Sequence, residues 1–317
     1  MIISAQGLRK TFTTKSRKGT QTVEAVRGVD LEVKNGEIFG VLGPNGAGKT
    51  TTIRMLATLI APDAGTAIVA GHDVSKEPTA VRRKLGYVSQ SGGVEDDVSP
   101  RAQITMAARI HGVPDPAARA AEILTDLELA DLADRPGNTL SGGQKRRVAI
   151  ALGLVHSPPL LFLDEPTTGL DPQNRANLWD RIRTLREKGT SVLLSTHYLD
   201  EADALCDRLV IVDHGQVVAQ GTPAELKREV SGDVVTLRLD DLTRAAEVLK
   251  PHARDIRVDD DLLRVYVDDG EHALPALLRL LEENGLALRS ISLDRATLDD
   301  VFLAKTGRSL RDTGVSE

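Results

Sequence analysis

Cysteine is nearly absent from this chain, and aromatic residues are scarce. The 317 residues include one cysteine, Cys206, so no disulfide can form within the chain. This predicts a protein of a reducing compartment, in which Cys206 packs as a small apolar side chain. Phenylalanine, tyrosine and tryptophan make up 3% of the residues, which argues against a base-stacking platform for nucleic acid.

Long hydrophobic runs are also missing. A membrane-spanning helix needs about 20 consecutive apolar residues, and the densest apolar stretch, Val148–Leu163, is interrupted by Gly153, His156 and two prolines. Met1–Lys10 lacks the apolar segment of a signal peptide. We therefore expect a soluble chain, located in the cytoplasm, that reaches a membrane only through a partner.

Net charge is unevenly distributed. Of the 40 basic and 46 acidic residues, residues 1–230 hold 28 of each, which leaves 12 basic and 18 acidic residues after them. The whole charge of −6 thus belongs to the C-terminal part. This predicts a domain boundary near residue 230 and argues against a basic, nucleic-acid-binding tail.

Strand and helix patterns alternate up to that boundary. Segments rich in β-branched or apolar residues predict strands at Ile2–Leu8, Val23–Val33 and Ile38–Leu42, with Thr13–Thr22 as an exposed hairpin loop. Residues 99–135 predict helices with a proline break. Further helices and strands then alternate, which indicates a parallel sheet with crossovers; they are expected at Gln144–Val155, Leu160–Leu163, Gln173–Glu187, Ser191–Ser195, Leu199–Cys206 and Leu209–Val212.

The pattern after residue 231 predicts a small accessory domain over residues 231–306. Its elements follow the order β-α-β-β-α-β, which is typical of a ferredoxin-like α+β fold. We expect no catalytic group in it, and we expect residues 307–317 to form a flexible polar tail. The predicted elements are Val234–Leu239, Leu242–Leu249, Ile256–Val258, Leu262–Val267, Ala273–Asn284 and Leu288–Leu293.

A glycine-rich loop between a strand and a helix carries the strongest chemical signal. It fits the pattern G-x-x-x-x-G-K-[ST], in which backbone N–H groups and a helix N-terminus surround phosphate oxygens. Lys49 would bind the β- and γ-phosphates, and the Thr50 hydroxyl would ligate Mg²⁺. The residues predicted to bind ATP here are Gly43, Pro44, Asn45, Gly46, Ala47, Gly48, Lys49, Thr50 and Thr51.

Two adjacent carboxylates follow a later apolar strand. Asp164 ends the strand, where it can hold Mg²⁺, and Glu165 is placed to polarise an attacking water. Alone, Asp164 would also suit a helix cap and Glu165 a solvated charge. Together with the glycine-rich loop they predict a nucleoside triphosphatase of the P-loop class, with an α/β fold.

The sequence Leu-Ser-Gly-Gly-Gln at Leu140–Gln144 narrows the class. In this order and spacing the motifs resemble the ABC ATPase family, whose hallmark is this signature. The resemblance implies a mixed-sheet core with a helical subdomain at about residues 91–155, and two ATPase subunits facing head to tail. Each ATP would then be held by the glycine-rich loop of one chain and, from the opposite chain, by Ser141, Gly142, Gly143, Gln144 and Asp171.

Further family motifs match single residues. By resemblance, Gln90 is the glutamine-loop residue that senses Mg²⁺ and the membrane subunit, His197 is the switch histidine at the γ-phosphate, and Phe12 stacks on adenine. Without that context, Gln90 would be interpreted as a polar strand end, and His197 and Phe12 as core residues. The catalytic residues expected are thus Glu165 and His197.

The nearest subgroup is the daunorubicin-resistance-type exporter ATPases, which the chain resembles over nearly its whole length, including Gly36–Gly40, Ser195–Ala202 and Leu298–Leu303. Export through a separate permease, with a drug, antibiotic or lipid-like cargo, is the function this implies. One departure affects coupling, because Ala102 stands where the subgroup has a glutamate that faces the membrane subunit.

Three alternatives remain open from the sequence. An importer ATPase would carry the same core motifs, and only the C-terminal resemblance favours export. A non-transport ABC protein of translation or repair type is disfavoured, because one set of motifs is present and no long coiled coil separates Lys49 from Ser141. A degenerate ATP-binding regulator is disfavoured because Lys49, Asp164, Glu165 and His197 are all present.

Overall fold

A computed structural model describes residues 1–16, 19–230, 232–259, 262–308 and 310. The chain forms two compact units, the first covering Met1–Gln220 and the second beginning at Gly221. The division falls ahead of the boundary at 230 that the charge pattern predicts. Among the helices in the described ranges, none has the length and apolar character that crossing a bilayer requires.

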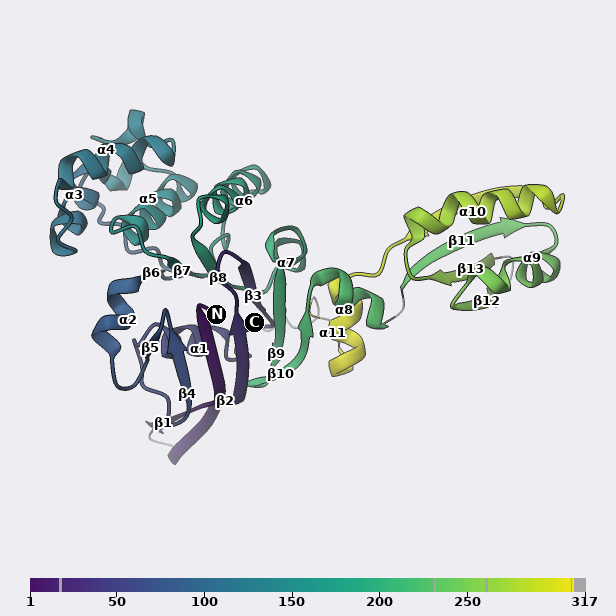
Figure 1. The fold of residues 1–317 in the computed structure, drawn as a ribbon, viewed down its shortest axis with the longest axis horizontal. Helices are drawn as coiled ribbons and strands as arrows, with labels where there is room; N and C mark the ends of the chain where they lie inside the picture. Colours follow the sequence, from purple (N-terminus) through teal and green to yellow (C-terminus); the bar gives the residue numbers. More distant parts are fainter. Residues whose placement is uncertain (17–18, 231, 260–261, 309, 311–317) are drawn as a thin grey trace. The chain divides into compact units, whose positions relative to one another are not determined.

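The first unit contains an antiparallel and a parallel sheet (Figure 1). The antiparallel sheet has the strand order β2-β1-β4-β5 and consists of β1 (Ile3–Ser16), β2 (Gly19–Val33), β4 (Ala64–Val69) and β5 (His72–Asp73). The second sheet has the order β10-β9-β3-β8-β7-β6, with β9 to β6 all parallel. Its strands are β3 (Ile38–Leu42), β6 (Leu85–Val88), β7 (Leu160–Asp164), β8 (Ser191–Thr196), β9 (Arg208–Asp213) and β10 (Gln216–Gly221).

Buried apolar side chains from both sheets and from α1 meet in one core, which includes Leu8, Leu56 and Phe162. The strands β3, β7 and β8 are buried along their whole length, as is usual for parallel strands covered on both faces. Because the carboxyl ends of such strands share one edge, the loops that follow β3, β7 and β8 are brought together. The helices of this unit are α1 (Lys49–Leu56), α2 (Pro78–Lys84), α3 (Pro100–Ile110), α4 (Pro116–Asp126), α5 (Gly142–Leu154), α6 (Pro172–Glu187) and α7 (Leu199–Leu205), with short 3₁₀ turns at Ala130–Leu132 and Gly137–Thr139.

The helices α3, α4 and α5 pack on one another and form a helical lobe near β6 and β7 (Figure 1). Ser99 caps α3 by accepting a hydrogen bond from the backbone N–H of Ala102, and Asp115 caps α4 in the same way. The break that the prolines predict between these helices is present at residues 111–115. The fold class expected from the sequence, a mixed-sheet core with helices, is confirmed.

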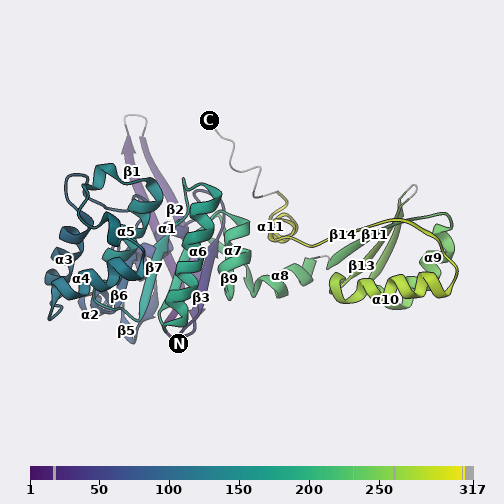
Figure 2. The same ribbon diagram turned by 90° about the horizontal axis from the view of Figure 1, so that it is seen from above.

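The prediction of an exposed loop at Thr13–Thr22 is wrong. The strands β1 and β2 continue as an antiparallel ribbon, with Thr13 opposite Thr22 and Ser16 opposite Gly19 (Figure 2). Ladder hydrogen bonds depend on the backbone and not on apolar side chains, and β-branched threonines favour extended chain. The polar composition therefore did not end the strands. Residues 17 and 18 lie outside the described residues.

The second unit contains the predicted β-α-β-β-α-β order. Its antiparallel sheet has the order β12-β13-β11-β14, and α9 and α10 pack on one face of it through a core that includes Val235, Leu237 and Leu281. The ferredoxin-like prediction is confirmed. Most of the predicted tail lies outside the described residues. The elements are α8 (Pro223–Val230), β11 (Asp233–Leu239), α9 (Leu242–Leu249), a 3₁₀ turn (Lys250–His252), β12 (Asp255–Asp259), β13 (Leu262–Val267), α10 (Gly270–Glu283), β14 (Leu288–Asp294) and α11 (Leu298–Thr306).

The first and last helices of the second unit pack on each other. Leu226 of α8 is fully buried, as are Val301 and Phe302 of α11.

A chain that ends at Val230 retains α8 but loses α11, so it exposes Leu226. We expect such a chain to bind ATP as tightly as the full chain, while the α8 amides exchange rapidly with solvent. A chain that ends at Gln220 is the matched control. Weaker ATP binding by either folded truncation, measured by calorimetry, would contradict an accessory role for the second unit.

Candidate active site

The glycine-rich loop joins β3 to α1, and glycine is required at two of its positions. Gly48 has a φ of +100°, and a Cβ there would lie 2.3 Å from the carbonyl oxygen of Ala25. A Cβ on Gly43 would lie 2.2 Å from the carbonyl oxygen of Val212. Among the residues that the structure describes, no side chain caps the N-terminus of α1. Its first N–H groups are therefore open to an anion, as the sequence pattern predicts.

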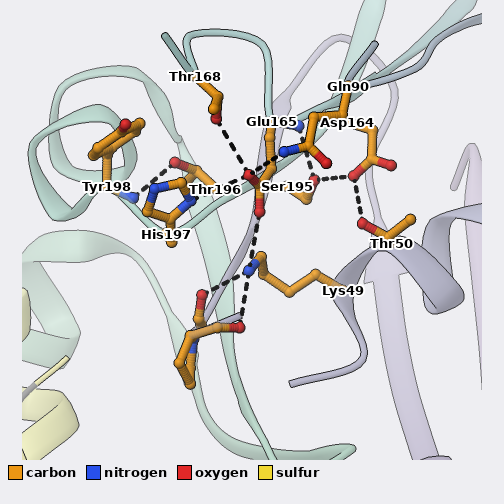
Figure 3. Close-up of polar contacts among 12 residues, drawn as sticks. Lys49, Thr50, Gln90, Asp164, Glu165, Thr168, Ser195, Thr196, His197 and Tyr198 are labelled. Carbon is orange, nitrogen blue, oxygen red and sulfur yellow. Dashed lines mark hydrogen bonds and ion pairs between the residues drawn. The ribbon is translucent and has the colours of Figure 1, made fainter. Parts of the chain in front are cut away.

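The side chain of Lys49 is held by backbone carbonyl groups of the glycine-rich loop. The ammonium group donates to the carbonyl oxygens of Gly43 (2.8 Å) and Pro44 (3.0 Å), and it lies 3.3 Å from Glu165 Oε1 (Figure 3). Burial lowers the pKa of Lys49, and the neighbouring Glu165 carboxylate opposes that shift. The side chain is 4% exposed, so its charge is poorly screened and attracts phosphate strongly.

The Asp164 carboxylate lies beside the Thr50 hydroxyl. Thr50 Oγ1 donates to Asp164 Oδ1 at 2.9 Å, and Ser195 Oγ donates to the same oxygen at 2.6 Å (Figure 3). A hydroxyl and a carboxylate oxygen are ligands of the kind that Mg²⁺ prefers. Of the three residues predicted as metal ligands, Thr50 and Asp164 thus fit the metal in their chemistry and proximity, whereas the Gln90 side chain contacts Glu165.

Glu165 is the most heavily contacted side chain of the site. It accepts hydrogen bonds from Gln90 Nε2 and Thr168 Oγ1, each at 3.2 Å, and the Nδ1 of His197 also lies 3.2 Å away (Figure 3). Burial alone would raise the pKa of Glu165, but the His197 contact and the Lys49 charge outweigh it and lower the pKa to about 2. The group is therefore a carboxylate at neutral pH.

The backbone at Glu165 is strained. Its φ is +46°, a region that non-glycine residues seldom occupy. The backbone N–H is held by Ser195, whose side-chain and carbonyl oxygens lie at 3.1 and 3.2 Å. Strain of this kind persists where the surroundings over-determine the geometry, which is characteristic of functional sites.

Lys49, Thr50 and Glu165 line one cavity of about 600 Å³, a size suited to a small-molecule ligand, while the predicted Gly43, Pro44, Ala47 and Asp164 are not among its lining residues. Phe12 stands at its wall and is 41% exposed, as a side chain that stacks on a ligand must be. Val23, Ala25 and Thr168 also line the cavity and were not predicted. The predicted residues that line it are Phe12, Asn45, Gly46, Gly48, Lys49, Thr50, Thr51, Gln90, Glu165 and His197.

Ser195 was also missed by the sequence analysis. Strands β7 and β8 are parallel neighbours with Asp164 opposite Ser195, so both side chains reach the same strand edge. The sequence shows a serine near the end of β8, but placing it beside Asp164 requires the register of the sheet. Thr168 lies three positions after Glu165, and only the fold of that loop turns its hydroxyl back.

The signature residues do not line the cavity. Ser141 is exposed and starts α5 with a capping box, in which its hydroxyl accepts from Gln144 N and Gln144 Oε1 accepts from Ser141 N. Asp171 starts α6 by accepting from Asn174 N at 2.9 Å. The two helix starts adjoin, since a Cβ on Gly143 would lie 2.9 Å from Asn174. They form a second surface, separate from the Lys49 cavity, and their role opposite another chain stays a prediction.

A parallel sheet, a phosphate-binding loop with its lysine, and a buried Asp–Glu pair at the strand edge define a P-loop nucleoside triphosphatase. A family model described as "ABC transporter" matches residues 26–168, and one described as "ATP-binding protein DrrA1-3-like, C-terminal domain" matches residues 221–306. The chain belongs to the ABC transporter family as an ATP-binding and ATP-hydrolysing subunit, which confirms the family identified from the motifs.

Similar proteins include the daunorubicin/doxorubicin resistance ATP-binding protein DrrA of Streptomyces peucetius, 44% identical over 99% of this chain and 95% of that protein. The Nod factor export ATP-binding protein I of Ralstonia nicotianae is 38% identical over 98% of this chain and 95% of that protein. Among solved structures, a dimeric ATP-binding cassette bound to ADP and Pi has a TM-score of 0.63 and 26% identity, covering 69% of this chain and 98% of that one.

Proposed function

We propose that this chain powers export of a drug-like, antibiotic or lipid-like compound through a separate membrane permease, as one of two identical ATPase subunits. Its place is the cytoplasmic face of the membrane, and it needs no nucleic acid. The observation that carries the proposal is the division of the site. Lys49 and Glu165 line one cavity, while Ser141, which starts the signature helix, does not line it. This supports a site that the signature of a second chain completes.

Export is favoured over import by the second unit. The match to the DrrA1-3-like C-terminal domain covers residues 221–306, and two similar proteins that share nearly the full length are named for drug resistance and for Nod factor export. A regulator without catalysis is disfavoured, because Lys49 and His197 both contact Glu165, at 3.3 and 3.2 Å.

Within the site each side chain has a proposed task. Lys49 and the α1 N-terminus bind the phosphates of ATP, and Glu165 orients and deprotonates the attacking water with His197 beside it. Thr50, Asp164 and Gln90 would hold Mg²⁺, which would neutralise phosphate charge. From the opposite chain, Ser141 to Gln144 and Asp171 would close over the γ-phosphate.

An apolar row on α3 is the proposed contact for the permease. Met106 and Ile110 are 57% and 73% exposed, and the exposed Ala102 lies one turn before Met106 on the same side of the helix; Val98, 39% exposed, comes just before the cap of α3. The alanine that replaces the subgroup's glutamate therefore leaves this row of Ala102, Met106 and Ile110 without a carboxylate. The loop between Gln90 and α3 connects the face to the catalytic carboxylate.

Replacing Lys49 by alanine tests the nucleotide site. The change removes a buried charge-assisted phosphate contact, so ATP affinity is expected to fall by about 10²-fold. Isothermal titration calorimetry measures it, with Lys76→Ala as the control because Lys76 is an exposed lysine paired with Asp73. Unchanged affinity in a folded Lys49 variant would place the phosphates elsewhere. The proposed ATPase function is tested with the wild-type chain and a permease in vesicles, which must release phosphate from MgATP.

A further inference from the structure

Arg146 joins three segments of the first unit from a buried position. It lies five residues after Ser141 on α5 and is 7% exposed. Its Nη1 donates to the carbonyl oxygens of Ser89 (2.6 Å) and Gln90 (3.4 Å), and its Nη2 donates to the carbonyl oxygen of Asp164 at 3.0 Å. One guanidinium thus connects the signature helix to the glutamine loop and to the end of β7.

The carbonyl acceptors of Arg146 belong to the two segments that contact or adjoin Glu165. Gln90 donates its side-chain amide to Glu165, and Asp164 precedes Glu165 in the chain. A displacement of α5 would therefore move the amide donor and the strand end together. Burial lowers the pKa of Arg146 to about 10, with Asp164 and Glu201 opposing the shift, so the group is still a cation at neutral pH.

The neighbouring arginine provides a contrast. Arg147 also donates to two carbonyl oxygens, those of Leu127 (3.2 Å) and Glu128 (3.1 Å). Both acceptors lie just after α4, so this residue ties α5 to its own helical lobe. A buried cation is costly to keep unless it is needed, and packing alone would be met by an apolar side chain, as at Ile150 on the same helix.

We propose that Arg146 is a positioning residue that links the two nucleotide sites of the dimer. In each chain, the ATP of the opposite subunit sets the position of the signature helix. Arg146 then makes that chain's own Gln90 loop and Glu165 move together with the helix. The guanidinium suits this role because its rigid fork of donors holds several carbonyl groups in fixed relative positions. The inference rests on the proposed head-to-tail dimer.

The test separates turnover from binding in Arg146→Gln, Arg146→Lys and the control Arg147→Gln. Arg146→Gln is expected to lower kcat at saturating MgATP on the order of 10²-fold, because small misplacements of catalytic groups have effects of this size. ATP affinity, and ATP-driven dimerisation followed by light scattering, are expected to remain as in the wild type. Arg146→Lys keeps the charge and part of the donor set and should recover part of the lost kcat.

Arg147→Gln should lower the unfolding temperature without lowering kcat. The inference is overturned if Arg146→Gln turns over at the wild-type rate, or if Arg147→Gln loses as much kcat as Arg146→Gln does. If Arg146→Gln does not fold, Arg146→Lys decides: reduced kcat with unchanged affinity supports the link, and wild-type kcat refutes it. A wild-type chain that fails to hydrolyse ATP would instead refute the proposed function.

Discussion

Replacing Glu165 by glutamine is expected to slow ATP hydrolysis by about 10²–10⁴-fold, the usual cost of losing a general base. Glutamine keeps the size of the side chain and an oxygen that can accept from Gln90 and Thr168, but it cannot take a proton. ATP binding should survive, and the nucleotide-bound dimer should accumulate because it no longer turns over.

The electrostatics of Glu165 explain how one carboxylate can serve this task. Lys49 and His197 hold its pKa at about 2, which is too low for an efficient base near neutral pH. Phosphate oxygens compete with Glu165 for Lys49, since both are anions within reach of the same ammonium group. Binding of ATP is therefore expected to raise the pKa of Glu165 and to make it a stronger base when substrate is present.

Steady-state phosphate release together with nucleotide titration checks the Glu165→Gln prediction. Glu122→Gln is the matched control, since Glu122 pairs with Arg119 on the surface of α4. Wild-type turnover in Glu165→Gln would remove Glu165 from the catalytic role and leave the strained backbone there without a chemical reason.

Replacing Ser141 by arginine is expected to abolish ATP-driven dimerisation and hydrolysis while each chain still binds ATP. Ser141 is exposed and lies away from the Lys49 cavity, so the change leaves that cavity untouched. A long cation at the signature helix start would block close approach to the opposite chain. Light scattering in the Glu165→Gln background measures the dimer directly.

Two controls accompany the Ser141 prediction. Ser99→Arg also replaces a helix-capping serine, on α3, so it matches the loss of a cap, about 1 kcal/mol, without altering the proposed dimer surface. Mixing the Ser141→Arg and Lys49→Ala chains should restore one composite site and part of the activity. Normal hydrolysis by Ser141→Arg as a monomer would show that the site is not shared.

The sequence by itself determined the chemistry of this protein. The glycine-rich loop, the Asp164–Glu165 pair and the signature at Leu140–Gln144 are contiguous segments, and their residue types follow directly from what phosphate and metal binding require. The β-α alternation and the ferredoxin-like order were also predictable, because hydrophobic periodicity is local along the chain.

The tertiary structure decided which groups act together. The contacts of Ser195 with Asp164, of Lys49 with Glu165 and of Arg146 with the glutamine loop join residues more than 15 positions apart. They depend on strand register and on burial, which no local pattern encodes. The long β1–β2 ribbon has the same explanation, since its polar segment is held by backbone pairing across two strands. Residue type identifies which side chains take part in the site, but only the packing of distant segments around a common core sets the distances at which they interact.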